Sequence, residues 1–266
     1  MDKEQLFNQY KLNTKREKRK IVTWQLLLFV FLLISWEILS KFRILDPLLF
    51  SSPTEVIELL IRKLQDLTLV PHILTTFFET IISFIVGTVG GVLFATSLTF
   101  SKKLSDVLSP YIVVLNAMPK VALGPILLVI FGPNVVAVIA MGIFISIIIT
   151  TIVIFGAFQQ VNENCVKVLT MLQANKKQIF WHATLPSAIP TIISTMKVNI
   201  GLAWVGVIVG EYLVSTKGLG YLIISGFQIF NFNIVFLALC IIVVLAATMY
   251  KVLEYFEKWL LTRFNF

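Results

Sequence analysis

The chain has 266 residues, of which 58% are hydrophobic and only 14% are charged. Soluble domains usually carry about 45–50% apolar and roughly 25% charged residues, so the composition excludes an ordinary soluble domain. The formal net charge is +8, but the basic residues lie at the ends of apolar runs, which favours a role in membrane orientation over nucleic-acid binding.

The apolar residues gather in runs of about 20, without the alternation that is typical of barrel strands. We therefore predict an all-α, polytopic membrane protein with about six transmembrane helices, because only helices or closed barrels satisfy every backbone polar group in hydrocarbon. The expected spans are 22–40, 74–98, 107–131, 133–158, 187–213 and 233–253.

The N-terminal part is expected to form a basic cytoplasmic segment, 1–21, followed by a first helix and an external amphipathic piece, 22–73. The first apolar run is too long for a signal peptide and does not end in a small-residue cleavage site, so we expect it to be retained. Residues 53–66 have the pattern of a short helix on the outer surface, with Ser52 or Thr54 as its cap.

Fifteen Lys and Arg residues fall on the side shared with the N-terminus and five on the other side. This asymmetry predicts an even number of spans with both termini in the cytoplasm. The core transmembrane domain is expected at 74–256 and a cytoplasmic tail at 257–266.

Prolines interrupt the third expected span and bracket Asn116 and Lys120. Broken helices are common where transporters bind or pass solutes, although a kink that serves packing is an equal alternative. Two pairs of glycines four residues apart, Gly87–Gly91 and Gly206–Gly210, indicate close helix packing.

Polar and ionisable residues within spans are candidates for a translocation pathway. The two lysines among them attract an anion or pair with Glu79 or Glu211, and structural pairing is favoured because an unpaired charge in lipid is costly. The candidates for the pathway are Glu79, Asn116, Pro119, Lys120, Lys197, Asn199, Trp204 and Glu211.

The polar stretch 159–185 between the fourth and fifth spans is too long and too patterned for a simple connector. Its apolar residues show partial helical spacing, which indicates a cytoplasmic docking element. The chain has no phosphate-binding loop, and its two histidines, His72 and His182, are expected on opposite sides of the membrane, where they make no shared metal site. We expect no cofactor and no catalysis, so any ATPase must be a separate partner.

A set of residues after position 159 forms a pattern: Ala174, Phe180, Leu185-Pro186, Pro190, Ala203-Trp204, Glu211 and Gly218-Leu219-Gly220-Tyr221. By this pattern the chain, from residue 159 onward, resembles the inner-membrane permeases of type I ABC importers. The chain departs from the family pattern at Lys167, Leu169 and Gln173, which stand where the family has Glu, Ala and Gly. Upstream, Ser52–Val56, Pro119–Pro125 and Phe131-Gly132 resemble the sulfonate, taurine and nitrate permease group.

This resemblance implies a MetI-like fold in the bacterial inner membrane. It implies two permease copies, most simply a homodimer, with two ATPase subunits and an extracytoplasmic binding protein. The substrate would be a sulfonate, taurine, nitrate, a related anion or a vitamin precursor. The residues implied in coupling to the ATPase are Lys167, Val168, Leu172, Gln173, Ala174, Asn175, Phe180, Leu185 and Pro186.

Two other classes remain as alternatives. A secondary transporter or channel without an ATPase predicts inverted repeats or carboxylate pairs deep in the membrane, and neither is clear in the sequence. A non-transporting scaffold or sensor gives no reason for a proline-broken span beside a docking segment.

Overall fold

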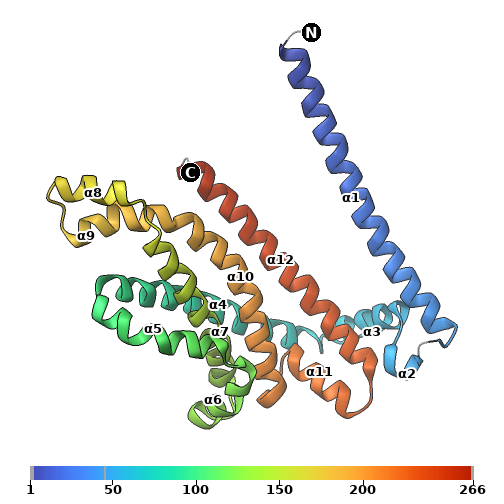
Figure 1. Ribbon diagram of the computed structural model, residues 1–266. Coiled ribbons are helices and arrows are strands. Elements are labelled where there is room, and N and C mark those ends of the chain that lie inside the picture. The colour runs from blue at the N-terminus through green and yellow to red at the C-terminus, as the bar shows by residue number, and fades with distance from the viewer. Residues whose placement is uncertain (1–2, 45, 265–266) are drawn as a thin grey trace.

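The computed structural model describes residues 3–44 and 46–264, and this range contains helices and no strand (Figure 1). Helix α1 (Lys3–Lys41) stands apart from the rest of the bundle in the figure. It is attached at its C-terminal end, where the Thr54 hydroxyl donates to Glu37 Oε1 at 2.6 Å. The ring of Trp36 also packs on Phe236 with centroids 5.2 Å apart.

Two short helices follow, α2 (Pro47–Phe50) and α3 (Pro53–Gln65). The side-chain oxygen of Ser52 accepts a hydrogen bond from the Glu55 N–H at 3.3 Å, and Pro53 occupies the first turn, where no N–H partner is needed. Helix α3 buries Val56 while its charged residues face outward. The prediction of a short amphipathic helix is therefore confirmed, with Ser52 as its cap.

Three long helices form the centre of the bundle: α4 (Val70–Phe100), α7 (Val135–Gln159) and α10 (Leu185–Val214). Their backbones approach closely because small residues meet at the crossings. A β-carbon added at Gly206 would stand 2.5 Å from the Cα of Gly142, and one at Gly87 would stand 2.6 Å from the Ser146 Cβ. The predicted close packing at these glycines is confirmed.

The third expected span is broken, as the prolines predict. Helix α5 (Lys102–Ala117) is followed by a 3-10 turn, η1 (Lys120–Leu123), and by α6 (Gly124–Phe131), and the two halves are bent by 101°. Met118 is extended, as expected for a residue before proline. Five described helices are long and apolar enough to span a membrane, or six if this bent pair counts as one span.

The remaining helices are α8 (Glu163–Met171), α9 (Lys176–Ile179), the π-helical turn η2 (Phe180–Thr184), α11 (Leu219–Gln228) and α12 (Phe232–Phe264). Helix α9 continues through η2 into α10, so the second half of the 159–185 segment is a helical extension of the span. Helix α12 likewise continues through residues 257–264, the described part of the expected tail.

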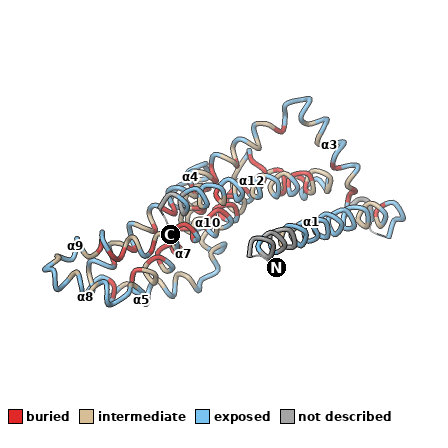
Figure 2. Tube along the Cα trace, turned by 90° about the horizontal axis from the view of Figure 1, so that it is seen from above, coloured by how far each residue is buried: buried red, intermediate tan, exposed pale blue. Residues whose placement is uncertain are grey.

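Both ends of the chain lie toward the same side of the molecule in Figure 1, and α2, α3 and α11 lie toward the opposite side. Figure 2 shows that the buried residues follow the central helices, whereas α1, α8 and α9 are mostly exposed. The α8–α9 segment therefore projects from one end of the bundle.

Candidate functional site

The projecting segment presents apolar side chains to its surroundings. Val168 is 57% exposed, Leu172 is 72% exposed and Met171, which the sequence analysis did not single out, is 82% exposed. The three residues share one helical face, since they are spaced by three and four positions. The spacing of three positions between Val168 and Met171 is visible in the sequence, and it is the signal that could have identified Met171 as a coupling residue.

A tight turn fixes α8 relative to α9. Gln173 has a φ of 59°, in the left-handed region, and the Ala174 N–H donates to the Leu169 carbonyl at 3.0 Å. This is the geometry that glycine usually supplies after a helix, so Gln173 keeps the expected turn at the position where the resembled family has Gly. Asn175 then begins α9 with a reciprocal capping box to Gln178.

Phe180 was included among the residues that contact the ATPase, but its side chain is buried within the chain. It is 5% exposed and packs against Phe100 and Phe158, with ring centroids 5.0 and 5.3 Å away. Its apolar ring is therefore used inside the chain, where it anchors the projecting segment to α4 and α7. Lys167 is exposed and pairs only locally, with Glu163 at 3.3 Å.

The π-helical turn η2 connects this anchor to α10. The Leu185 N–H donates to the Phe180 carbonyl, and Pro186, which has no N–H, follows in the first turn of α10. Single π turns inside α-helices often mark functional sites. Here the extra residue sets the direction in which the projecting segment leaves the span.

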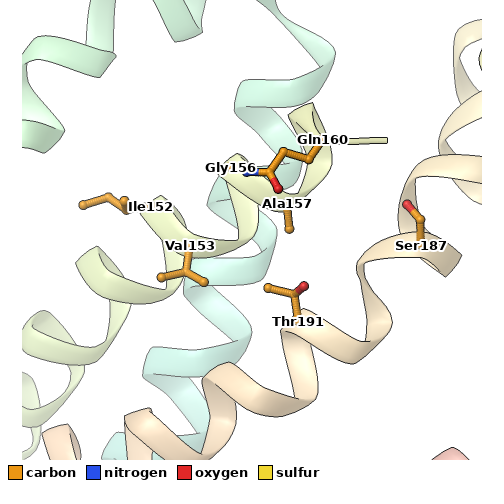
Figure 3. Close-up of a pocket in the computed structure, with 7 residues that line it drawn as sticks. All are labelled: Ile152, Val153, Gly156, Ala157, Gln160, Ser187 and Thr191. Carbon is orange, nitrogen blue, oxygen red and sulfur yellow. The ribbon is translucent and has the colours of Figure 1, made fainter. Parts of the chain in front are cut away.

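A cleft of about 470 Å³ opens between the end of α7 and the start of α10 (Figure 3). A second cleft of about 460 Å³ lies between α8 and η2, and Ser187 lines both. The predicted pathway residues, all within the described ranges, are absent from the linings of these two clefts. The residues that line the first cleft are Ile152, Val153, Gly156, Ala157, Gln160, Ser187 and Thr191.

Four predicted pathway residues lie in the interior of the single chain. Glu79, Asn199, Trp204 and Glu211 are at most 4% exposed. Asn199 Nδ2 donates across the bundle to Thr88 at 2.9 Å and to Thr150 at 2.5 Å, which joins α10 to α4 and α7. In this conformation the four residues contribute to helix packing.

The two intramembrane lysines do not pair as the sequence suggested. Lys197 forms an ion pair with Glu257 of α12, and it is separated from Glu211 by about four turns of α10. Lys120 Nζ donates to the Asn116 carbonyl at 3.0 Å and lies 3.4 Å from its side-chain oxygen. Lys120 therefore binds the end of α5 at the break, beside Pro119, so its expected pairing with Glu79 or Glu211 is wrong.

A cluster that the sequence did not reveal joins α4 to the turn between α10 and α11. The Thr76 hydroxyl donates to Glu211 Oε1, and Gly220 N–H donates to Glu211 Oε2, each at 2.6 Å. The Leu219 N–H donates to Thr76 Oγ1 at 2.8 Å, and Gly218 N–H donates to His72 Nδ1 at 3.0 Å. Gly218 has a φ of 115°, which favours glycine at this turn.

Comparison with known proteins places this architecture among transporters. Residues 87–262 match the family described as binding-protein-dependent transport system inner membrane component. A probable ABC transporter permease protein of Haemophilus influenzae is 27% identical over 90% of this chain and 95% of its own. A putative aliphatic sulfonates transport permease protein of Bacillus subtilis is 25% identical over 93% of this chain and 90% of its own.

Among solved structures, an inward-facing methionine ABC transporter chain has the same fold. Its TM-score is 0.62 at 18% sequence identity, with 71% of this chain and 94% of that chain covered. The likeness to this structure is therefore one of overall fold.

Proposed function

This chain belongs to the family of binding-protein-dependent transport system inner membrane components, and from that premise we propose that its α8–α9 segment is the surface that an ABC ATPase grips. The chain is the non-catalytic permease of an ABC importer in the inner membrane, and ATP hydrolysis belongs to a separate subunit.

The exposed apolar face of α8 supports this docking role. Val168, Met171 and Leu172 remain in contact with solvent although the segment is held by a capped turn and by the buried ring of Phe180. An apolar helix face that fits a partner's groove is a common mode of recognition. A rigid anchor behind that face transmits movement of the partner into α10.

The assembly that fits this surface is a permease homodimer with two ATPase subunits on the cytoplasmic side and a binding protein on the other side. Both termini and the α8–α9 segment are then cytoplasmic, consistent with the asymmetry of basic residues along the chain. The coincidence of the two chain ends at one side of the bundle supports the same orientation (Figure 1).

The substrate that we propose is a small organic anion of the sulfonate or taurine kind, with nitrate and vitamin precursors as neighbouring classes. The relative from Bacillus subtilis is named for aliphatic sulfonates, and the match extends over nearly the whole chain. Asn116, Pro119 and Lys120, at the break in the third span, are pathway candidates that, like Lys197, are not buried among the central helices.

The docking proposal is tested by copurification of the permease with its ATPase subunit and by uptake into proteoliposomes. We expect Leu172→Asp to reduce the copurified ATPase at least about tenfold, because a charge on the docking face has to be desolvated against an apolar groove. Phe230→Asp is the matched control, since Phe230 is 77% exposed in the turn between α11 and α12, at the opposite end of the bundle.

An unchanged yield of ATPase with Leu172→Asp, at normal expression, overturns the docking assignment. The substrate proposal is tested separately, with competition among taurine, an alkanesulfonate and nitrate for uptake by the complete transporter. Absence of competition by all three sinks the anion assignment and leaves the docking result intact.

A further inference from the structure

Two carboxyl groups from distant parts of the sequence meet in the interior of the bundle. Glu79 on α4 stands one turn after Thr76, whose hydroxyl donates to Glu211 on α10, so the two carboxyl groups share the contact between these helices. The residues are 3% and 0% exposed. No Lys or Arg of the described residues forms an ion pair with either carboxylate, since the ion pairs of the described residues lie elsewhere.

The hydrogen bonds around the pair distinguish the two groups. Glu211 accepts from the Thr76 hydroxyl and from the Gly220 N–H in the first turn of α11, a ten-residue helix. An N-terminal helical N–H and the helix dipole both favour a negative charge at this place. Glu211 is therefore built as the ionised member.

Glu79 has the opposite surroundings. Both of its carboxylate oxygens are buried and have no hydrogen-bond donor among the described residues. An ionised carboxylate only accepts hydrogen bonds, whereas a protonated one also donates. A second buried negative charge beside Glu211, without a donor or a cation, is strongly unfavourable.

We propose that Glu79 carries a proton and donates it in a hydrogen bond to the ionised Glu211. The pair then holds one negative charge, and the shared proton fastens α4 to α10 and to the start of α11. Glu79 is a positioning residue in this arrangement. It acts through Glu211 on the Gly218–Tyr221 turn, which lies at the end of the bundle opposite the docking segment.

The other titratable groups near this turn are distributed around His72. The His72 ring bonds to Gly218 and stacks on Tyr221 with centroids 5.9 Å apart. Lys63 of α3 and Lys217 of the turn are the cationic side chains whose charge acts on His72. These two cations act on His72 and form no ion pair with Glu79 or Glu211. A proton on Glu79 therefore relieves the repulsion between the two carboxylates directly.

Infrared spectroscopy of the complete chain in lipid tests the proposal directly. We expect Glu79→Gln to remove a carbonyl stretching band of a protonated carboxylic acid at neutral pH. Glu55→Gln is the control, because Glu55 is exposed on α3 and lies outside the carboxylate pair. If Glu79→Gln instead removes a band of an ionised carboxylate and leaves the acid band unchanged, the proposal is overturned.

Function supplies a second readout. Glu79→Gln keeps a neutral donor in place and is expected to retain roughly half or more of the wild-type uptake rate in the complete transporter, whereas Glu79→Leu is expected to lose about tenfold, within the range of a lost interhelical hydrogen bond. Equal damage by Gln and Leu overturns the proposal. Stabilisation of the wild type, but not of Glu79→Gln, by sodium or potassium also overturns it, since a bound cation would then neutralise the pair.

Discussion

Ala174 and Leu169 are joined by a backbone hydrogen bond of 3.0 Å, which closes because Gln173 turns into the left-handed region after α8. A side chain with a β-carbon is disfavoured in that conformation by about 1–2 kcal/mol, and glycine is not. We expect Gln173→Gly to stabilise the turn by about 1 kcal/mol. Hydrogen exchange of the amides of residues 169–179 should become several-fold slower.

The same substitution at Gln160 is the matched control for this prediction. Gln160 is an exposed residue at the end of α7, and its φ is −90°. Glycine gains nothing there and adds conformational freedom to the unfolded chain, so Gln160→Gly should be neutral or destabilising. Faster exchange in Gln173→Gly than in the wild type would contradict the argument from backbone strain.

The crossing of α7 and α10 depends on the absence of a side chain at Gly206. A β-carbon there would stand 2.5 Å from the Gly142 Cα, which is backbone and has little room to shift. We expect Gly206→Ala to destabilise the folded chain by about 1–3 kcal/mol, the usual cost of overpacking. Thermal unfolding in detergent, followed by size-exclusion chromatography, measures the loss.

Gly201 lies on the same helix and provides the control. A β-carbon at Gly201 would have no neighbour within 4 Å, so Gly201→Ala should be neutral or should raise the stability of α10 slightly, since alanine is the better helix former. Equal destabilisation by the two substitutions would show that helix propensity or the lipid contact, and not the crossing, sets the effect.

The sequence predicted the spans well because long apolar runs are required by the membrane and are visible without any partner. It also predicted the break in the third span, since prolines at 119 and 125 remove backbone donors at fixed places. The glycine pairs indicated close packing, although not which helices meet, because that depends on residues far apart in the chain.

The sequence was less informative about side-chain partners. The sequence favours pairing of Lys197 with Glu79 or Glu211, whereas its partner is Glu257 of α12, 60 positions further along the chain. The resemblance and the apolar spacing place Phe180 among the coupling residues, because an apolar residue of an interface and one of a core look alike in a sequence. The meeting of Glu79 with Glu211 joins residues more than 130 positions apart and left no local pattern in the sequence.

We expect the stability contributed by the Lys197–Glu257 ion pair to require one positive and one negative charge, whichever of the two positions carries which. Glu257→Lys places two cations at the contact between α10 and α12, and the thermal stability of the chain should fall because like charges repel at close range. The exchanged pair, Lys197→Glu with Glu257→Lys, should recover most of the loss. A double variant that is no more stable than Glu257→Lys would show that the pair contributes through other contacts.

Phe180 should act as an anchor and not as a docking residue. Removal of its buried ring in Phe180→Ala leaves a cavity among Phe100 and Phe158, and we expect a loss of about 3 kcal/mol in the free energy of unfolding. Phe230→Ala, at an exposed ring, should change stability little. If Phe180→Ala lowers ATPase binding while stability is unchanged, the ring contacts the partner and the anchor role is wrong.

Cys165 offers a direct test of orientation, since it is exposed on α8 within the docking segment. A membrane-impermeant maleimide should label it in inside-out vesicles and not in intact cells, because the segment must face the ATP pool to meet an ATPase. Cys165→Ser is the control, as the remaining Cys240 lies on α12 within an apolar span. Addition of the ATPase subunit should slow the labelling of Cys165 by shielding α8, and labelling from the outside of intact cells would refute both the orientation and the docking proposal.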